Sequence, residues 1–145
     1  MIALLLALAA ADPPRTPVPI AGLPLAALPP QSLPTQGCAA YLFTAGQGRA
    51  LVGMASAAPG TLRLALDGRV ADYARQHQTG SAGFGFATTT TYHSADVTAT
   101  LDLAVQTRRD LSQGAVVDSG TLRIDRTGHD TVILPVAGLI GCAAT

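Results

Sequence analysis

The sequence predicts an all-β protein: a small antiparallel β-sandwich of seven to eight short strands, preceded by a signal peptide and a proline-rich spacer. Three observations predict it. Apolar residues between the two cysteines recur with a period of two, tight-turn signals separate these runs, and the charged residues are nine Arg and nine Asp, without Lys or Glu. Because Lys and Glu normally cover the exposed side of surface helices, their absence disfavours helix.

The N-terminus carries an export signal. Residues 2–11 are an unbroken run of ten apolar residues, whereas a helix needs about 20 to cross a bilayer. Alanines at positions 9–11 supply the small residues that signal peptidase accepts, and Asp12 begins a segment that cannot continue the helix. We predict cleavage after Ala11, which leaves no transmembrane span in the mature chain. A retained N-terminal anchor is the alternative.

Residues 12–37 form the predicted spacer. Eight of the chain's ten prolines lie in this stretch, and each one lacks a backbone donor and has a fixed φ. The segment is therefore expected to be extended and exposed. It also contains Val18, Ile20, Leu25 and Leu28, so part of it could instead lie on the domain.

The β-domain is expected to span residues 38–145, and its clearest strand covers 96–106. Apolar side chains alternate with polar ones there, the pattern of a strand with one side on a core and one side in water. Further strands are predicted near residues 39–44, 49–56, 84–92, 115–118 and 134–140.

Two hairpins set the expected strand pairing. Asp67-Gly68 is a two-residue turn signal, and a second turn surrounds Thr127-Gly128-His129. A helix over residues 69–77 would leave the strand before Asp67 without a partner, so strand is favoured there. The predicted opposite pairs are Leu64 with Ala71, Leu62 with Tyr73, Arg63 with Asp72, Ile124 with Val132 and Leu122 with Leu134.

Cys38 and Cys142 are predicted to form a disulfide. One opens the first strand of the domain and the other closes the last, and terminal strands of a sandwich often lie side by side. A disulfide persists in an oxidising compartment, in agreement with export to the periplasm or the cell exterior.

The strongest candidate for chemistry is Asp118. The seven residues 115–121, Ala-Val-Val-Asp-Ser-Gly-Thr, resemble the catalytic strand-turn of aspartic proteases, in which paired aspartates activate water. Only 25 residues follow Gly120, too few for the flap and crossing strands of that family. We therefore expect Asp118 to be a turn residue.

The remaining candidates for catalysis are His93, His129 and Ser94. No Gly-x-Ser-x-Gly elbow occurs, and Ser94 adjoins His93 on an extended chain, where neighbours point to opposite faces. With His77, these histidines are the only imidazoles, and no two are spaced as metal ligands. No catalytic residue, metal site or cofactor is therefore predicted.

Two segments have a distinctive composition. In Gly83-Phe84-Gly85-Phe86 the two aromatic residues are expected to share the core face of a strand, and the glycines permit a close approach of backbone. Thr89, Thr91, Thr98 and Thr100 are expected to share one outer face, which could bind an ordered polar surface or simply be solvated.

Composition narrows the function without identifying it. The formal net charge is zero and no basic run occurs, which argues against nucleic acid as a partner. We predict an exported, non-enzymatic binding or structural domain of the bacterial envelope, with a protein as its most probable partner. A small periplasmic hydrolase and a subunit of an envelope complex are the alternatives.

Overall fold

The fold was analysed in a computed structural model that describes residues 16–46 and 48–144. The predicted signal peptide, residues 1–11, lies outside the described residues. No helix long and apolar enough to cross a membrane occurs in the described part of the chain. The described part of the chain contains ten β-strands: β1 Val18–Pro19, β2 Leu25–Ala27, β3 Cys38–Thr44, β4 Leu51–Ser56, β5 Thr61–Leu66, β6 Arg69–Thr79, β7 Thr89–Ser94, β8 Val97–Gln106, β9 Gly114–Arg126 and β10 Val132–Cys142.

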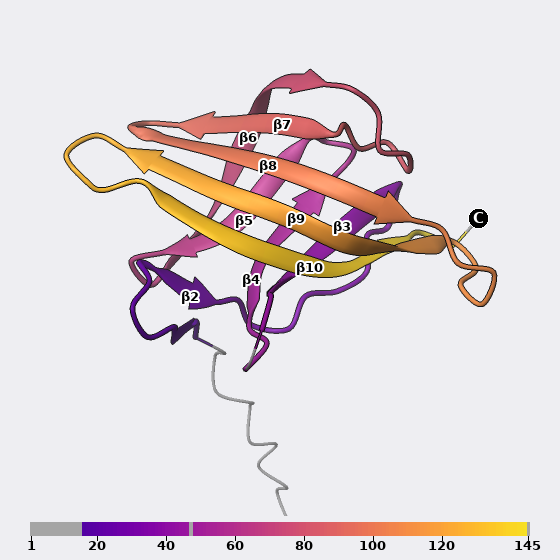
Figure 1. The fold of residues 1–145 in the computed structure, drawn as a ribbon, viewed down its shortest axis with the longest axis horizontal. Coiled ribbons are helices and arrows are strands. Elements are labelled where there is room, and N and C mark those ends of the chain that lie inside the picture. Colours follow the sequence, from indigo (N-terminus) through magenta and orange to yellow (C-terminus); the bar gives the residue numbers. More distant parts are fainter. Residues whose placement is uncertain (1–15, 47, 145) are drawn as a thin grey trace, which may run out of the picture.

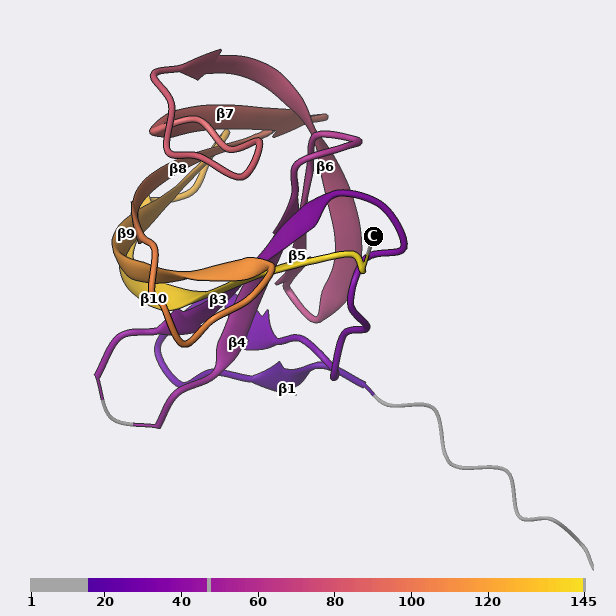
Figure 2. The ribbon, with the colours of Figure 1, turned by 90° about the vertical axis from the view of Figure 1, so that its right-hand side faces the viewer.

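Eight of these strands close into one antiparallel barrel (Figures 1 and 2). Each strand from β3 to β9 pairs with the next strand in the chain, including β5 with β6. The last strand, β10, also pairs with β3, which closes the sheet. The predicted antiparallel all-β class is confirmed, but the expected sandwich is wrong, because one closed sheet takes the place of two facing sheets. Both architectures bury one side of every strand, so period-two alternation cannot distinguish them.

The interior of the barrel is filled with side chains. Inward residues from all eight strands form one apolar core, and an eight-stranded barrel is just wide enough for its side chains to fill. The largest side chains that are fully enclosed include Leu42, Leu62, Leu64, Tyr92 and Leu122. The core thus occupies the space in which a wider barrel would hold a ligand.

Both hairpin registers are confirmed. In β5–β6, Leu64 pairs with Ala71, Leu62 with Tyr73 and Arg63 with Asp72. In β9–β10, Ile124 pairs with Val132 and Leu122 with Leu134. Residues 69–79 are strand β6, which rules out the helix considered for that segment.

The segment around Phe84 differs from the prediction of a strand over 84–92. Strand β7 begins only at Thr89, and Gly83 pairs with Phe86 in an isolated bridge. Gly83, Phe84 and Gly85 all have positive φ, so the chain turns tightly instead of extending. Phe86 is nevertheless buried in the core and Phe84 packs against it, as expected for these two aromatic residues.

The N-terminal strap, which we define as residues 24–37, lies on the barrel, with its first half largely buried and most of residues 32–37 exposed. Strand β2 pairs with the end of β5, and Leu25 is only 1% exposed within the main core. The Leu28 N–H donates to Leu51 O over 2.7 Å. Of the two possibilities that the sequence left open, docking on the domain therefore holds for the strap.

The disulfide joins the two strands that close the barrel. Cys38 in β3 and Cys142 in β10 are directly opposite each other, their Cα atoms are 4.0 Å apart, and the predicted bond is present. The Ala143 N–H donates to Gly37 O over 2.8 Å just beyond it. The strap and the C-terminus thus meet at this position.

Candidate functional site

The residues considered for catalysis are distributed over different parts of the barrel. His93 and Ser94 end β7, and His129 lies in the turn between β9 and β10; all three are exposed. His93 Nδ1 lies 3.1 Å from Thr98 Oγ1 of the neighbouring strand. These side chains are at the end of the barrel where the β7–β8 and β9–β10 turns adjoin, because Asp96 O accepts a hydrogen bond from Thr127 N.

Asp118 is not in a turn. It lies within the continuous strand β9, at a β-bulge where the pairing with β8 shifts between Ala104–Ser119 and Val105–Val117. The extra residue of a bulge is left unpaired and increases the local twist. Asp118 precedes Arg126 by eight residues in β9, or about 26 Å at about 3.3 Å per residue. The structure therefore separates Asp118 from His129, which lies beyond Arg126.

Metal ligands do not gather in the described part of the chain: residues 16–46 and 48–144 contain no group of three or more His, Cys, Asp or Glu side chains placed to hold an ion. The two cysteines are joined to each other. The described residues thus offer no set of donors for a metal.

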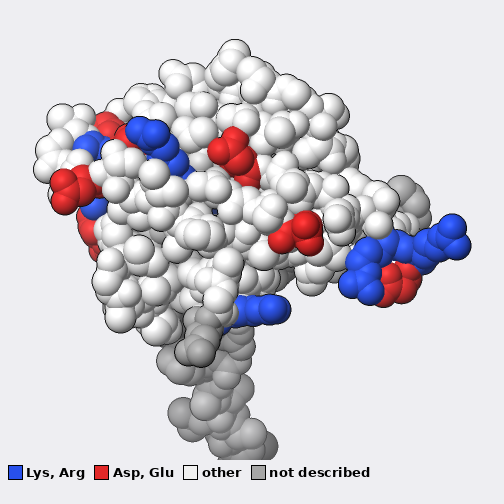
Figure 3. Space-filling model, in the orientation of Figure 1, with Lys and Arg blue, Asp and Glu red and all other residues white. Residues whose placement is uncertain are grey.

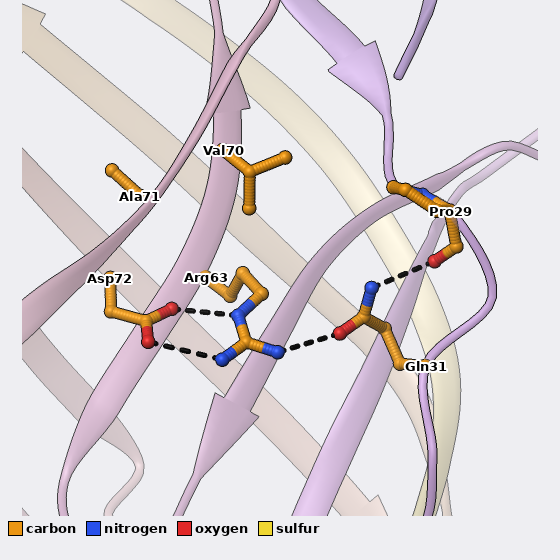
Figure 4. A pocket seen from close by; sticks show the side chains of 6 residues that line it. All are labelled: Pro29, Gln31, Arg63, Val70, Ala71 and Asp72. Atoms are coloured by element: carbon orange, nitrogen blue, oxygen red, sulfur yellow. Dashed lines mark hydrogen bonds and ion pairs between the residues drawn. The ribbon is translucent and has the colours of Figure 1, made fainter. Parts of the chain in front are cut away.

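A hollow of about 310 Å³ lies on the outside of β5 and β6 (Figure 4). Arg63 Nε and Nη2 donate to the two carboxylate oxygens of Asp72 over 2.8 and 3.1 Å, and Nη1 donates to Gln31 Oε1 over 2.7 Å. The hydrogen bond to Asp72 raises the pKa of Arg63. Gln31 Nε2 in turn donates to Pro29 O. These contacts fasten the strap to the barrel, which is a structural role.

A second surface is apolar where a solvated strand would be polar. One outward row crosses four strands: Met54 of β4 is opposite Tyr41 of β3, Tyr41 is opposite Leu139 of β10, and Leu139 is opposite Val116 of β9. We call the outward side chains of β3 and β10 the apolar face; they comprise Tyr41, Phe43, Ile133, Pro135, Ala137 and Leu139.

Strand β10 supplies the exposed part of this face. Its inward side chains Val136 and Ile140 are buried. Its outward side chains Ile133, Pro135, Ala137 and Leu139, which we call the apolar stripe, contain no charge. Ile133 is 63% exposed and Leu139 is 51% exposed. A strand that is apolar on both sides is typical of sheets covered on both faces.

The strap covers the other part of the apolar face. Leu28 is buried in a small outer cluster with Ala26 and Ala65, against which Leu51 and Met54 pack. Tyr41 Oη donates to Ser32 O over 2.9 Å, and burial raises the pKa of Tyr41. Coverage ends near Leu33, which lines an open groove together with Tyr41 and Leu139 but is itself 67% exposed.

Charges lie at the two ends of the apolar stripe. In Figure 3 charged groups gather near the β9–β10 turn and on the protruding β8–β9 loop, two separate acidic groups lie on the face between them, and one basic group lies at its lower edge. That loop contains Arg108, Arg109 and Asp110, and the turn contains Asp130. The four side chains of the stripe are themselves uncharged, but Asp118 of the neighbouring strand β9 is exposed beside Ala137.

The sequence analysis missed this face although its signal was present. Residues 132–142 form an uninterrupted apolar run, whereas 96–106 alternates cleanly. In a one-layer closed sheet, such a run leaves one side apolar and outward. The predicted strand near residues 134–140 agrees with β10, but no outward apolar face was predicted for it.

No protein-family model, curated protein sequence or solved structure matches the chain. The geometry of the described residues therefore carries the functional argument alone.

Proposed function

We propose that this chain is an exported, non-enzymatic binding or structural module of the bacterial envelope, and that its partner is a protein. The observation that carries the proposal is the partly covered apolar face of β3 and β10. An exposed, contiguous apolar surface on a folded domain is typical of a site for protein association.

The chain's own strap supports this interpretation. Where residues 24–37 lie over β3, β4 and β5, they place Leu28 and Pro30 next to Tyr41, Phe43 and Leu51. The outer surface of the barrel thus already accepts an extended peptide segment. The stripe on β10 continues this surface without a cover.

The filled interior also favours binding at the surface over small-molecule chemistry. Enzyme sites are commonly clefts that enclose most of a ligand, with polar groups converging on it. Here the core fills the barrel, and the groove lined by Met54, Ser56 and the strap, about 500 Å³, is open to solvent. The separation of Asp118 from His129 speaks against a shared hydrolytic site.

Export rests on two arguments. The Cys38–Cys142 disulfide agrees with an oxidising compartment. The apolar run at residues 2–11 agrees with a signal peptide. Location in the periplasm or outside the cell is proposed on both.

Site-specific photo-crosslinking tests the proposal in producing cells. A photo-reactive amino acid at position 139 is expected to form discrete protein adducts, because Leu139 belongs to the uncovered stripe and is 51% exposed. The matched control places it at position 70, where Val70 is 42% exposed on β6, and should form few adducts. Equal adducts at both positions would contradict a specific surface. A hydrolytic activity that Asp118→Asn abolishes would contradict the non-enzymatic assignment.

A further inference from the structure

We infer that the β8–β9 loop is a site of limited proteolysis, at which an arginine-specific serine protease cuts the folded chain directly after Arg108 or Arg109. The Cys38–Cys142 disulfide then holds the two pieces together as one two-chain barrel. The inference goes beyond the proposed function, because it does not depend on what the apolar face binds. It rests on the exposure of the loop, its few backbone contacts and the positions of the other arginines.

The β8–β9 loop, residues 107–113, is exposed along its whole length and protrudes from the barrel (Figure 1). Inside the loop, the only backbone hydrogen bond between described residues runs from Leu111 N–H to Arg108 O over 3.1 Å. At its base, Cys142 N–H donates to Gln113 O over 3.0 Å. Exposed loops with few backbone hydrogen bonds open at little cost in free energy, and they are the preferred sites of proteolytic cleavage.

The side chains of this loop suit an arginine-specific protease. Trypsin-like enzymes have a pocket with an aspartate that binds a basic side chain next to the cut bond. Arg108 pairs with Asp110 over 3.1 Å, and both side chains are more than half exposed. Arg109 is exposed and forms no ion pair within residues 16–46 and 48–144. Both guanidinium groups can therefore reach such a pocket while the barrel stays folded.

The other described arginines are held more firmly. Five of them lie within strands β5, β6 and β9, namely Arg63, Arg69, Arg75, Arg123 and Arg126. A strand must leave its ladder before a protease can bind its backbone, and in the core this opening costs up to the whole free energy of unfolding.

Arg49 is the remaining competitor, since it lies in the exposed turn between β3 and β4. The residue directly after it is fixed on two atoms. Ala50 N–H donates to Thr44 Oγ1 over 3.0 Å, and Ala50 O accepts a hydrogen bond from Thr44 N–H over 2.9 Å. The peptide bond after Arg49 is therefore held more rigidly than the bonds after Arg108 and Arg109.

The cut changes neither the core nor the closure of the barrel. Hydrolysis adds one water molecule across the peptide bond, which leaves a carboxylate on one piece and an amine on the other. After a cut behind Arg109, the C-terminal piece, residues 110–145, contains β9 and β10. Strand β9 still pairs with β8 and β10 still pairs with β3, while the disulfide links this piece covalently to the other one.

Brief trypsin digestion of the oxidised protein under native conditions tests the inference. The parent and every variant carry Arg15→Gln, because Arg15 lies outside the described residues. The first product should be a single species heavier by one water molecule, and reduction should separate it into pieces that end and begin at Arg108 or Arg109. Replacing both Arg108 and Arg109 by Gln should slow this first cut about tenfold or more. Arg49→Gln, the matched control in another exposed turn, should be cut like the parent.

Two digestion results would overturn the inference: a first cut at Arg49 or within a strand, or a double variant that is cut as fast as the parent. Circular dichroism of the cut, oxidised protein should match that of the intact protein, and loss of the β signal would overturn the two-chain barrel. None of these measurements involves crosslinking at position 139, so the inference and the proposed function fail separately.

Discussion

The outer surface of this barrel has two contrasting regions on one continuous sheet. On β7 and β8 it presents the threonine face, Thr89, Thr91, Thr98 and Thr100; all four are half-buried, and Thr91 lies directly opposite Thr100. On β3 and β10 it presents the apolar face. Inward residues are alike in both regions, so the core does not require the difference. The outward pattern therefore distinguishes the two regions: a polar surface of the kind that water solvates, and an apolar surface of the kind that is typical of a covered face.

The strap shows what the apolar pattern means for stability. Where it covers β3 to β5, it supplies buried side chains, a strand pairing and the Arg63–Gln31 contact. Where it ends, the apolar side chains remain exposed. Outward apolar side chains on a barrel are typical of a surface that another segment covers. Here the strap covers only some of them.

The largest expected effect comes from removing the covalent link between β3 and β10, the two strands that carry the apolar face. Replacing Cys38 and Cys142 together by alanine frees a loop of about 100 residues and should lower the free energy of unfolding by up to about 4.7 kcal/mol. Chemical denaturation of oxidised and substituted protein measures it. Non-reducing mass spectrometry of envelope-derived protein is the control, and two free thiols there would contradict the bond.

The next largest effect on the free energy of unfolding should distinguish the buried part of the strap from its exposed part. Leu25→Ala removes a fully buried side chain and should cost about 2 to 5 kcal/mol. Leu33→Ala, a matched change at an exposed position, should stay within about 0.5 kcal/mol of wild type. Denaturant midpoints of the two variants decide it. Equal values would mean that the strap is not part of the core in solution.

The pH dependence of stability should differ between two tyrosines, Tyr92 in the core and Tyr41 on the apolar face. Burial raises the pKa of Tyr92 above its ordinary value of 10.0, since the charged phenolate is poorly solvated in the core. Because the pKa of Tyr92 is higher in the folded than in the unfolded chain, its neutral phenol contributes fully to the free energy of unfolding below about pH 10. This contribution is lost as the pH rises through the pKa of the folded state. Tyr92→Phe should therefore flatten the alkaline loss of unfolding free energy more than Tyr41→Phe does. A larger effect of Tyr41→Phe would reverse this assignment.

The smallest expected effect lies on the threonine face. Thr91→Ala should change the free energy of unfolding by no more than about 0.5 kcal/mol. A solvated hydroxyl is hydrogen-bonded to water in both the folded and the unfolded chain, so its removal changes little. Thermal unfolding measures it, with Thr98→Ala as a second position. A loss well above 1 kcal/mol would show that these hydroxyls bind something ordered.

Local signals predicted the local structure well. Asp67-Gly68 specified the β5–β6 register to the residue, because a two-residue turn leaves little choice of pairing. The disulfide followed from two cysteines at the boundaries of the strand region. The apolar and polar faces of β8 also agree with its alternation.

Predictions failed where a residue type has several structural uses. Asp-Ser-Gly at residues 118–120 suits a turn, yet here it forms a bulge inside a long strand, since both need a local change in backbone direction. Prolines suggested a spacer, but β2 occupies three of the four residues between Pro24 and the Pro29-Pro30 pair. The barrel itself depends on the β5–β6 and β3–β10 pairings forming one closed sheet, which strand spacing does not encode.

The order of the strands also bears on how fast the barrel can form. Seven of its eight pairings join strands consecutive in the chain, and only β3–β10 joins distant ones. Hairpins form within about 1 to 10 µs, whereas a contact of long sequence separation must first overcome the entropy of closing its loop. Closure at this seam is therefore expected to be the late step of folding. Until β10 pairs with β3 the chain is a string of unclosed hairpins, and it is expected to become resistant to proteases only after this pairing forms.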